Sequence, residues 1–250
     1  MSEPDTGPEL KSLWDQPTAY ERWYASSLGR CYGASMEAVL SPWLSSSKAK
    51  RVLDVGCGPG LAAERLFTRD AEVWGLDCSL EMAYRARARG ETTGVPRFIV
   101  VGSVVSLPFP DGTFDLVSCV NCLEFVEDRH RAFREIARVL APAGRAVLAV
   151  LNRRSLWEIT RRLRRPISRT SYYDGRFFGE QELRDHCTTA GLDVVDCRSA
   201  VHFPPIPPGP LARLYLGWDR WACARRHRFG GVLLCHATKR AKTSARNENR

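Results

Sequence analysis

The sequence lacks any long hydrophobic run, since no apolar stretch approaches the roughly 20 residues needed to span a bilayer. Its first residues, MSEPDTGPEL, also lack the basic and apolar regions of a secretory signal peptide. No internal repeat is present. These absences favour a globular, cytoplasmic protein.

Patterns that would indicate disulfides or a metal site are missing as well. The nine cysteines are odd in number and scattered, unlike the framework of a small secreted protein, so we expect reduced thiols. Cys119 and Cys122 form a lone C-x-x-C, with no second pair and no histidines at ligand spacing. No metal site is therefore predicted. The pair is interpreted as ordinary thiols lining a pocket, and contact with a thiophilic substrate stays open.

What the chain does contain is enough apolar sequence for one large α/β domain with a full core. It has 250 residues, of which 44% are hydrophobic and 26% charged. The formal net charge is +9, and arginines crowd two segments, 153–165 and 220–228. Such asymmetry suits an anionic substrate, a membrane surface or nucleic acid.

Short apolar segments alternate with segments of helical periodicity along most of the chain. This rhythm predicts a parallel, doubly wound sheet whose ligands bind outside the carboxyl ends of the strands. Helices are expected within 17–44, over 61–67, after the capping residue Ser79, around 133–140, and over 153–165, 180–190 and 211–224. Residues 204–210 are too rich in proline for regular structure. The predicted strands cover 51–55, 71–76, 98–101, 114–119, 146–151, 192–197 and 232–237.

A glycine turn follows the first predicted strand and leads into a helix. Gly56, Gly58 and Gly60 permit close approach of the backbone to a ligand, and the turn presents free amides at a helix N-terminus. Leu61 stands where the dinucleotide fingerprint has its third glycine. The pattern is G-x-G-x-G preceded by Asp54, which disfavours a nicotinamide or flavin dinucleotide.

Several ordered motifs resemble the class I S-adenosylmethionine-dependent methyltransferases, in particular the type 11 subgroup related to ubiquinone and menaquinone methyltransferases. The resemblance covers about residues 51–151. It implies an α/β fold with a doubly wound, mostly parallel seven-stranded sheet plus helical and loop cap segments, and S-adenosylmethionine as methyl donor. The motifs are Asp54-x-Gly56-x-Gly58-x-Gly60, the acidic Asp77 after strand two, Leu107-Pro108-Phe109, Phe114-Asp115-Leu116-Val117, and Arg138-Val139-Leu140-x-Pro142-x-Gly144.

The resemblance also implies which residues contact the cofactor. Asp54 would hold its amino group, and Asp77 would accept hydrogen bonds from both ribose hydroxyls. Ser103 stands where many relatives have an acidic residue facing the adenine, so a weaker bond is expected there. The full predicted set is Asp54, Gly56, Cys57, Gly58, Gly60, Asp77, Cys78, Met82, Ser103, Val104 and Cys119.

Methyl transfer from a sulfonium depends mainly on orientation, but the nucleophile can still need a base. Asn121 and Glu124 follow strand four, where the substrate of this family meets the methyl group, and are the predicted catalytic residues. Glu124 has a second interpretation, as a solvated carboxylate at a helix start. His130 and His202 are weaker candidates, for which a surface or packing role is favoured.

The acceptor is expected in the segments around this core, which are rich in aromatic residues and proline and favour a small aromatic or lipid-like molecule. The arginine-rich helix within 153–165 suggests peripheral contact with an anionic membrane, or a solvated lid. Nucleic acid is not expected, because no Asx-Pro-Pro-aromatic motif and no nucleic-acid module is present. An RNA methyltransferase and a non-catalytic cofactor-binding protein remain as alternatives.

The predicted organisation is a single methyltransferase domain over residues 17–238. A loose N-terminus (1–16) precedes it and a disordered basic tail (239–250) follows it. Within the domain we expect an N-terminal helical cap (17–45), the cofactor-binding core (51–151), and two cap or substrate segments (152–179 and 202–224).

Overall fold

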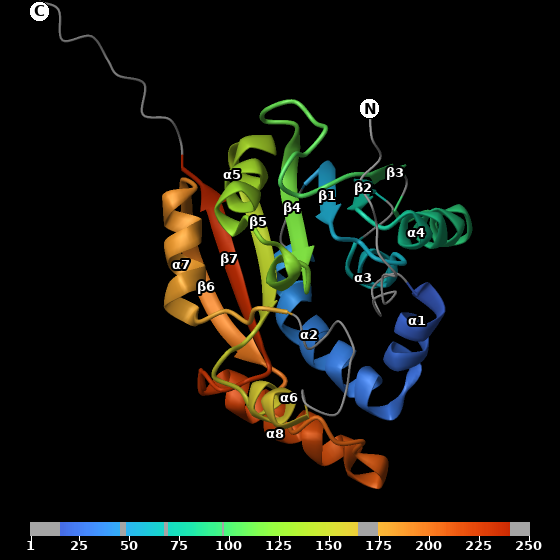
Figure 1. Ribbon diagram of the computed structural model, residues 1–250, viewed down its shortest axis with the longest axis vertical. Coiled ribbons are helices and arrows are strands. Elements are labelled where there is room, and N and C mark those ends of the chain that lie inside the picture. The colour runs from blue at the N-terminus through green and yellow to red at the C-terminus, as the bar shows by residue number, and fades with distance from the viewer. Residues whose placement is uncertain (1–15, 46–48, 68–69, 97, 165–174, 241–250) are drawn as a thin grey trace, which may run out of the picture.

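The computed structural model describes residues 16–45, 49–67, 70–96, 98–164 and 175–240. A seven-stranded sheet forms its centre, in the order β3-β2-β1-β4-β5-β7-β6. All pairs from β3 to β5 are parallel, and β7 is antiparallel to both β5 and β6. The predicted doubly wound, mostly parallel sheet is therefore confirmed (Figure 1). The strands are β1 (Arg51–Val55), β2 (Glu72–Asp77), β3 (Phe98–Val101), β4 (Phe114–Val120), β5 (Leu140–Leu151), β6 (Leu192–Ala200) and β7 (Val232–Lys239).

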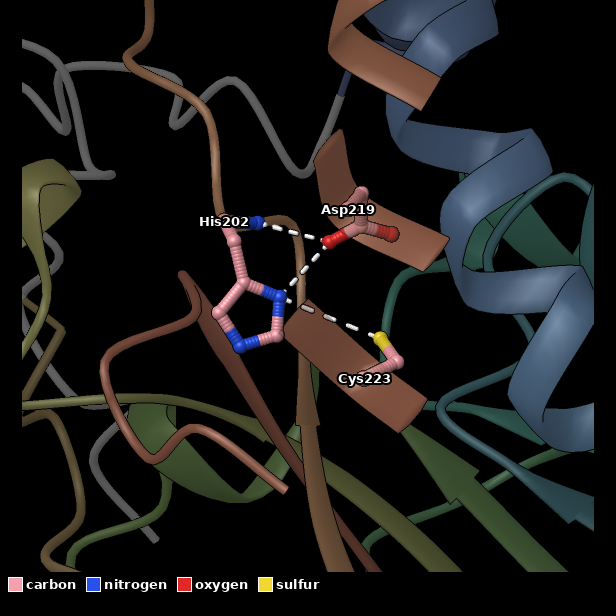
Figure 2. Close-up of side chains that lie close together, drawn as sticks. All are labelled: His202, Asp219 and Cys223. Carbon is pink, nitrogen blue, oxygen red and sulfur yellow. Dashed lines mark hydrogen bonds and ion pairs between the residues drawn. The ribbon is translucent and has the colours of Figure 1, made fainter. Parts of the chain in front are cut away.

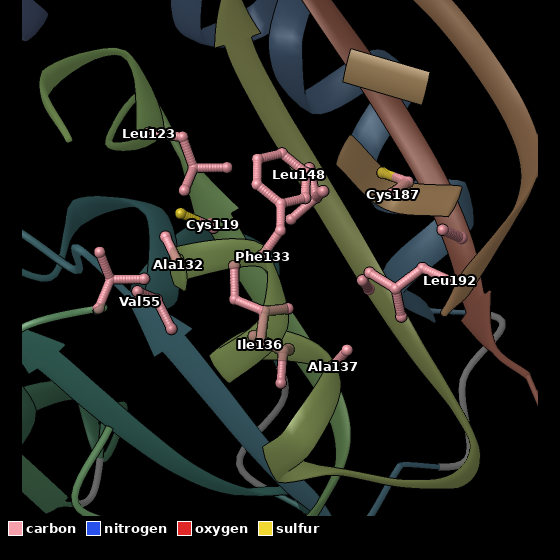
Figure 3. Packing of buried hydrophobic residues seen from close by; sticks show 14 of the residues in the cluster. Val55, Cys119, Leu123, Ala132, Phe133, Ile136, Ala137, Leu148, Cys187 and Leu192 are labelled. Carbon is pink, nitrogen blue, oxygen red and sulfur yellow. The ribbon is translucent and has the colours of Figure 1, made fainter. Parts of the chain in front are cut away.

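Helices cover both faces of the sheet. One face packs mainly on α5 and α7, where Phe133, Ile136 and Leu183 are fully buried, and Figure 3 shows this packing around Phe133 and Leu148. The other face is covered by α2, α3, α6 and α8. The helices are α1 (Pro17–Ala25), α2 (Ser27–Ser45), α3 (Leu61–Leu66), α4 (Leu80–Thr93), α5 (Arg129–Val139), α6 (Leu156–Arg164), α7 (Glu180–Thr189) and α8 (Ala212–Ala224), with short 3-10 turns η2 (Leu123–Phe125) and η4 (Gly209–Leu211).

Several predicted boundaries were wrong, because pairing with a neighbouring strand extends a strand beyond its apolar run. β5 begins at Leu140 instead of 146, since Leu140 pairs with Phe114 of β4. β6 continues to Ala200, which pairs with Val232 of β7, and β7 itself runs to Lys239. The proline-rich loop also contains one regular turn, η4.

The structure confirms the predicted N-cap of the helix after strand two. Ser79 caps α4, its Oγ accepting from the Met82 N–H at 3.4 Å. No helix among the described residues is long and apolar enough to cross a membrane. The predicted loose N-terminus and basic tail lie almost entirely outside the described residues, as do residues 165–174 of the arginine-rich and aromatic segment.

Candidate functional site

The glycine turn after β1 adopts the backbone that its sequence predicts. Gly56, Gly58 and Gly60 all have positive φ angles (68°, 52° and 80°), which favour glycine. The N–H groups of Gly56 and Cys57 donate to the Leu76 carbonyl at 2.7 and 3.0 Å, so β2 anchors the turn. A Cβ at Gly58 would meet nothing within 4 Å. The backbone at Gly58 therefore faces open space that a ligand can fill.

An outer cavity of about 580 Å³ opens beside this turn, at the carboxyl ends of β1, β2 and β4. Asp77 lines it, and its carboxylate is held in place by two backbone donors, Gly58 N–H at 2.8 Å and Ser79 N–H at 2.9 Å. Because a carboxylate accepts hydrogen bonds at about four sites, Asp77 is a group to which the hydroxyl donors of a ligand in this cavity can bind. Of the predicted cofactor residues, the lining includes Gly56, Gly58, Asp77, Cys78, Met82, Ser103 and Val104.

An inner cavity of about 60 Å³ adjoins the outer one, since Tyr20, Gly56 and Val120 line both. Asp54 and Cys57 lie in its wall. Asp54 is 2% exposed. Its Oδ1 accepts from the Ser118 hydroxyl, whereas its Oδ2 is buried with no hydrogen-bond partner among the described residues.

This burial perturbs the acidity of Asp54. Desolvation, with a smaller contribution from the charge of Asp77, raises the pKa of Asp54 to about 7. An unpaired buried carboxylate oxygen is costly unless a cation or donor reaches it. The inner cavity is therefore suited to a positively charged group with N–H donors.

Three tyrosines from α1 and α2 close the inner cavity: Tyr20, Tyr24 and Tyr32, called here the tyrosine cluster. Their rings are in contact, with centroids 4.9 Å apart for Tyr20–Tyr24 and 6.1 Å for Tyr24–Tyr32. All three lie within residues 17–45, which the sequence predicts as an N-terminal helical cap. Which aromatic side chains of the cap line a cavity could not be predicted, because helical periodicity gives the face of a helix but not what lies opposite it.

Asn121 connects the tyrosine cluster to the end of β4. Its φ of 53° is left-handed, a conformation that asparagine tolerates better than most residues. Its Nδ2 donates to the Tyr32 hydroxyl at 2.8 Å, and its Oδ1 is buried with no hydrogen-bond partner in the described part of the chain. Asn121 also lines the outer cavity, and its partner Tyr32 lines the inner cavity. The Asn121 side chain therefore lies close to both cavities.

The interpretation of Glu124 as a solvated carboxylate was wrong. Glu124 lies in the turn η2 and is 1% exposed, and neither carboxylate oxygen has a hydrogen-bond partner among the described residues. Desolvation by burial raises its pKa to about 8. The side chain lines neither cavity.

Two predicted cofactor residues also line neither cavity. Gly60 is the N-cap of α3, where a Cβ would lie 3.3 Å from the Arg89 side chain. Cys119 is fully buried in the core, whereas Cys122 of the same C-x-x-C lines the outer cavity. Neither residue lies in the wall of a cavity, and the contacts of Gly60 and Cys119 with a cofactor stay predictions.

The two histidine candidates lie away from the cavities. His130 is exposed on α5. His202 follows β6, and its Nδ1 lies 2.7 Å from Oδ1 of the buried Asp219. Figure 2 shows the pair with Cys223, whose Sγ is 3.8 Å from the same nitrogen. The packing interpretation is the one that this geometry supports.

His202, Asp219 and Cys223 are also residue types that bind metals, with ligand atoms within 4.8 Å of one another. Two ligands of a tetrahedral zinc are about 3.3 Å apart, given bonds of about 2.0 Å. The observed 2.7 Å between nitrogen and oxygen is instead a hydrogen-bond distance. Asp219 also accepts from the His202 N–H and from Ser35 of α2, so the cluster joins α8, α2 and the loop after β6.

Comparison with known proteins adds sequence relatives. Residues 53–148 match the model of a family described as a methyltransferase domain. An uncharacterized protein of Mycobacterium tuberculosis is 32% identical over 205 residues, covering 81% of this chain and 67% of the relative. The ubiquinone biosynthesis O-methyltransferase of Marinobacter nauticus is 29% identical over 183 residues, covering 70% and 74%. That of Xanthomonas oryzae is 40% identical over 104 residues, covering 41% and 44%.

Solved structures share the fold. A methyltransferase from Thermotoga maritima, described as a possible histamine N-methyltransferase, has a TM-score of 0.67 at 23% identity and covers 91% of this chain and 98% of its own. Geranyl diphosphate C-methyltransferase from Streptomyces coelicolor, solved with S-adenosyl-L-homocysteine, has a TM-score of 0.56 at 16% identity and covers 81% and 79%. At these identities the likeness concerns the fold alone.

Proposed function

The chain belongs to the class I S-adenosylmethionine-dependent methyltransferases, and from this premise we propose that it methylates a small aromatic or lipid-like acceptor held under the tyrosine cluster. S-adenosylmethionine supplies a methyl group that its sulfonium has already activated for displacement. The observation that carries the proposal is the pair of adjoining cavities, one lined by Asp77 and the glycine turn, the other closed by tyrosines.

The residues present fit this cofactor. The unpaired Asp54 Oδ2 matches an ammonium group, which would supply both charge and N–H donors to the buried carboxylate. The Asp77 carboxylate is held in place by the backbone and would accept hydrogen bonds from a pair of ribose hydroxyls. Met82, Ser103 and Val104 lie in the wall of the same outer cavity and would enclose the adenine.

The tyrosine cluster, where the two cavities meet at Tyr20, supports an aromatic or lipid-like acceptor. Tyrosine rings offer flat apolar surface together with a polar hydroxyl, which suits a ring that carries its own hydroxyl groups. The ubiquinone biosynthesis O-methyltransferases among the relatives are named for a process whose product is such a molecule. Oxygen is accordingly the acceptor atom that we propose.

Asn121 and Glu124 are the proposed catalytic residues. The Asn121 Oδ1 would accept a hydrogen bond from the acceptor hydroxyl, and Tyr32 holds the amide in the required orientation. Glu124 is three residues further on and is buried outside both cavities. We propose that, through an intervening water, it receives the proton that the acceptor loses, and does so in its ionised form, above its raised pKa of about 8. Residues 17–238 would act as one domain, in which 17–45, 152–179 and 202–224 surround the core 51–151.

The experiment is a methyl-transfer screen with labelled S-adenosylmethionine and a panel of phenols, catechols and quinols, with primary amines as the opposing class. We expect labelled product from the hydroxylated aromatic compounds. Glu124→Gln should lower kcat about 10²-fold or more, within the usual range for general-base catalysis, without changing affinity for S-adenosylhomocysteine. Transfer to amines alone would contradict the acceptor class, and an unchanged kcat in Glu124→Gln would contradict the proton acceptor.

A further inference from the structure

Helix α6 turns an apolar stripe outward. Leu156, Ile159 and Leu163 are spaced i, i+3 and i+7, so they lie on one side of the helix. They are 52%, 55% and 72% exposed. The opposite side of α6 is buried, where Trp157 packs into the core and its Nε1 donates to the Phe203 carbonyl at 2.8 Å. The outer stripe of α6 therefore does not contribute to the hydrophobic core, which α6 reaches through Trp157.

Helix α8 repeats this arrangement with larger side chains. Leu214, Trp218 and Trp221 form one side of it and are 67%, 55% and 41% exposed. The two indole rings stack with centroids 4.8 Å apart. The other side of α8 is fixed to the protein through the buried Asp219 and Ala222. Exposed tryptophan next to leucine is typical of residues that enter the headgroup region of a bilayer.

The two stripes form a single surface. A groove of about 670 Å³ runs between the helices, with Leu156 of α6 on one side and Leu214 and Trp218 of α8 on the other. Figure 1 shows both helices at the same end of the molecule. We call this surface the α6–α8 face; its apolar residues are Leu156, Ile159, Leu163, Leu211, Leu214, Trp218 and Trp221.

The described residues of α6 and α8 expose charge of only one sign. Arg162, Arg213 and Arg220 are exposed on the two helices, and Arg225 lies over the Trp221 ring at 4.8 Å. The carboxylates of the same helices, Glu158 and Asp219, are buried and already paired. Among the described residues of α6 and α8, no acidic side chain therefore reaches the surface. A second copy of this chain would bring arginines against arginines, whereas a negatively charged surface complements them.

We propose that the α6–α8 face is a docking surface for an anionic lipid bilayer. The arginines contact lipid phosphates, and the leucine and tryptophan side chains enter the boundary between headgroups and acyl chains. Both helices lie flat on the membrane, as their one-sided apolar stripes require.

Docking brings the membrane close to the inner cavity. The ring centroid of Trp157, on the buried side of α6, is 5.7 Å from that of Tyr32 in the tyrosine cluster. A bilayer on the outer side of α6 is thus one helix away from the acceptor site. That an acceptor enters from the lipid rests on the proposed function, whereas the docking itself does not.

The test is co-sedimentation of the full chain with vesicles of phosphatidylcholine, alone or with phosphatidylglycerol added. Wild-type protein is expected to pellet with the anionic vesicles and to be released by salt. Arg213→Glu with Arg220→Glu should weaken binding about tenfold or more, since each basic residue near an anionic surface contributes measurably. Leu214→Ser with Trp218→Ser should weaken binding by a similar factor even at low salt.

Matched controls come from α4, which faces elsewhere. Arg87→Glu changes an exposed arginine and Tyr84→Ser an exposed aromatic residue, and both should leave vesicle binding unchanged. Circular dichroism and affinity for S-adenosylhomocysteine check that each variant folds. Equal binding to neutral vesicles, no binding at all, or equal loss in the α4 controls would overturn the proposal. A dimer that the α8 substitutions dissociate, without vesicle binding, would assign the face to a second copy instead.

Discussion

Asp54 is buried at a cost in free energy, and it is also the residue that we propose binds the ammonium group of the cofactor. The carboxyl group is buried, and among the residues that the structure describes only its Oδ1 has a hydrogen-bond partner. Burial therefore raises its pKa to about 7, compared with 3.8 in an unstructured chain. Between these two values Asp54 binds more protons in the folded protein than in the unfolded one, so the contribution of Asp54 to the free energy of unfolding falls as the pH rises from about 4 to about 7.

Cofactor binding should lower the raised pKa of Asp54 and so favour the ionised carboxylate. An ammonium group beside Asp54 stabilises the ionised carboxylate, so binding of S-adenosylhomocysteine at about pH 6 is expected to release a fraction of a proton. Calorimetry in two buffers with different ionisation enthalpies measures that release. Asp54→Asn should remove the buffer dependence and weaken binding, with exposed Asp193→Asn as the matched control. A binding enthalpy independent of buffer in the wild type would argue against an ammonium group at Asp54.

At the scale of elements, α1 is held over the glycine turn by arginines of α4. Glu21 of α1 pairs with Arg85 at 2.9 Å and with Arg89 at 2.6 Å. Arg89 also donates to the Pro59 carbonyl of the turn at 2.9 Å. Hydrogen bonding to Arg85 is the main reason that the pKa of Glu21 is lowered. The attachment is therefore complete above the usual range of a glutamate and is lost as the pH falls through the lowered pKa.

Removing this charge should loosen α1 selectively. Glu21→Gln is expected to speed amide hydrogen exchange in α1 and to weaken S-adenosylhomocysteine binding several-fold, because Tyr20 beside it lines both cavities. Glu91→Gln, whose partner Arg87 is 72% exposed, is the control. Exchange that rises equally throughout the protein would mean that the ion pairs support the whole fold and not α1 in particular.

The cluster of Asp219, His202 and Ser35 attaches α8 to the rest of the protein. Asp219 is 2% exposed and accepts from the His202 N–H at 2.8 Å, from the ring of His202 and from the Ser35 hydroxyl. These bonds lower its pKa, against the effect of burial. Their contribution to stability is therefore present above pH 4 or so and is lost in acid.

Asp219→Ala should cost about 3 kcal/mol of unfolding free energy at neutral pH, the order expected when one partner of a buried pair is removed. Denaturant titration measures it, and Asp185→Ala, an exposed carboxylate on α7, is the control. Loss of less than about 0.5 kcal/mol, the range of ordinary surface substitutions, would contradict a structural role. Such a result would call for a metal-binding measurement on His202 and Cys223.

For the molecule as a whole, the sequence predicts the sheet better than the surroundings of the site. Strands β1 and β3 were predicted with their observed limits, because each is a short apolar run between clear turns. The start of β5 was predicted too late, because Pro142 and Gly144 are typical of turns although the strand begins before them, at Leu140, which pairs with Phe114. Local composition determines such elements only in part; the neighbouring strand determines the rest.

The candidate site divides in the same way. Asp77 and the three glycines could be found because turn chemistry is local and lies within a few residues. The side-chain hydrogen bond to Asp54 Oδ1 comes from Ser118, 64 residues away. The burial of Glu124 depends on how the chain packs around η2. Contacts between distant segments leave no periodic signal, so neither property could be predicted from the sequence.

Calorimetric titration with S-adenosylhomocysteine tests most directly whether the outer cavity holds the cofactor. The wild-type protein should bind at one site per chain. Asp77→Asn keeps an acceptor for the Gly58 N–H but loses the charge, and Asp77→Ala loses both; we expect about tenfold weaker binding for the first and a greater loss for the second. Wild-type affinity in both Asp77 variants, with unchanged stability, would contradict the assignment.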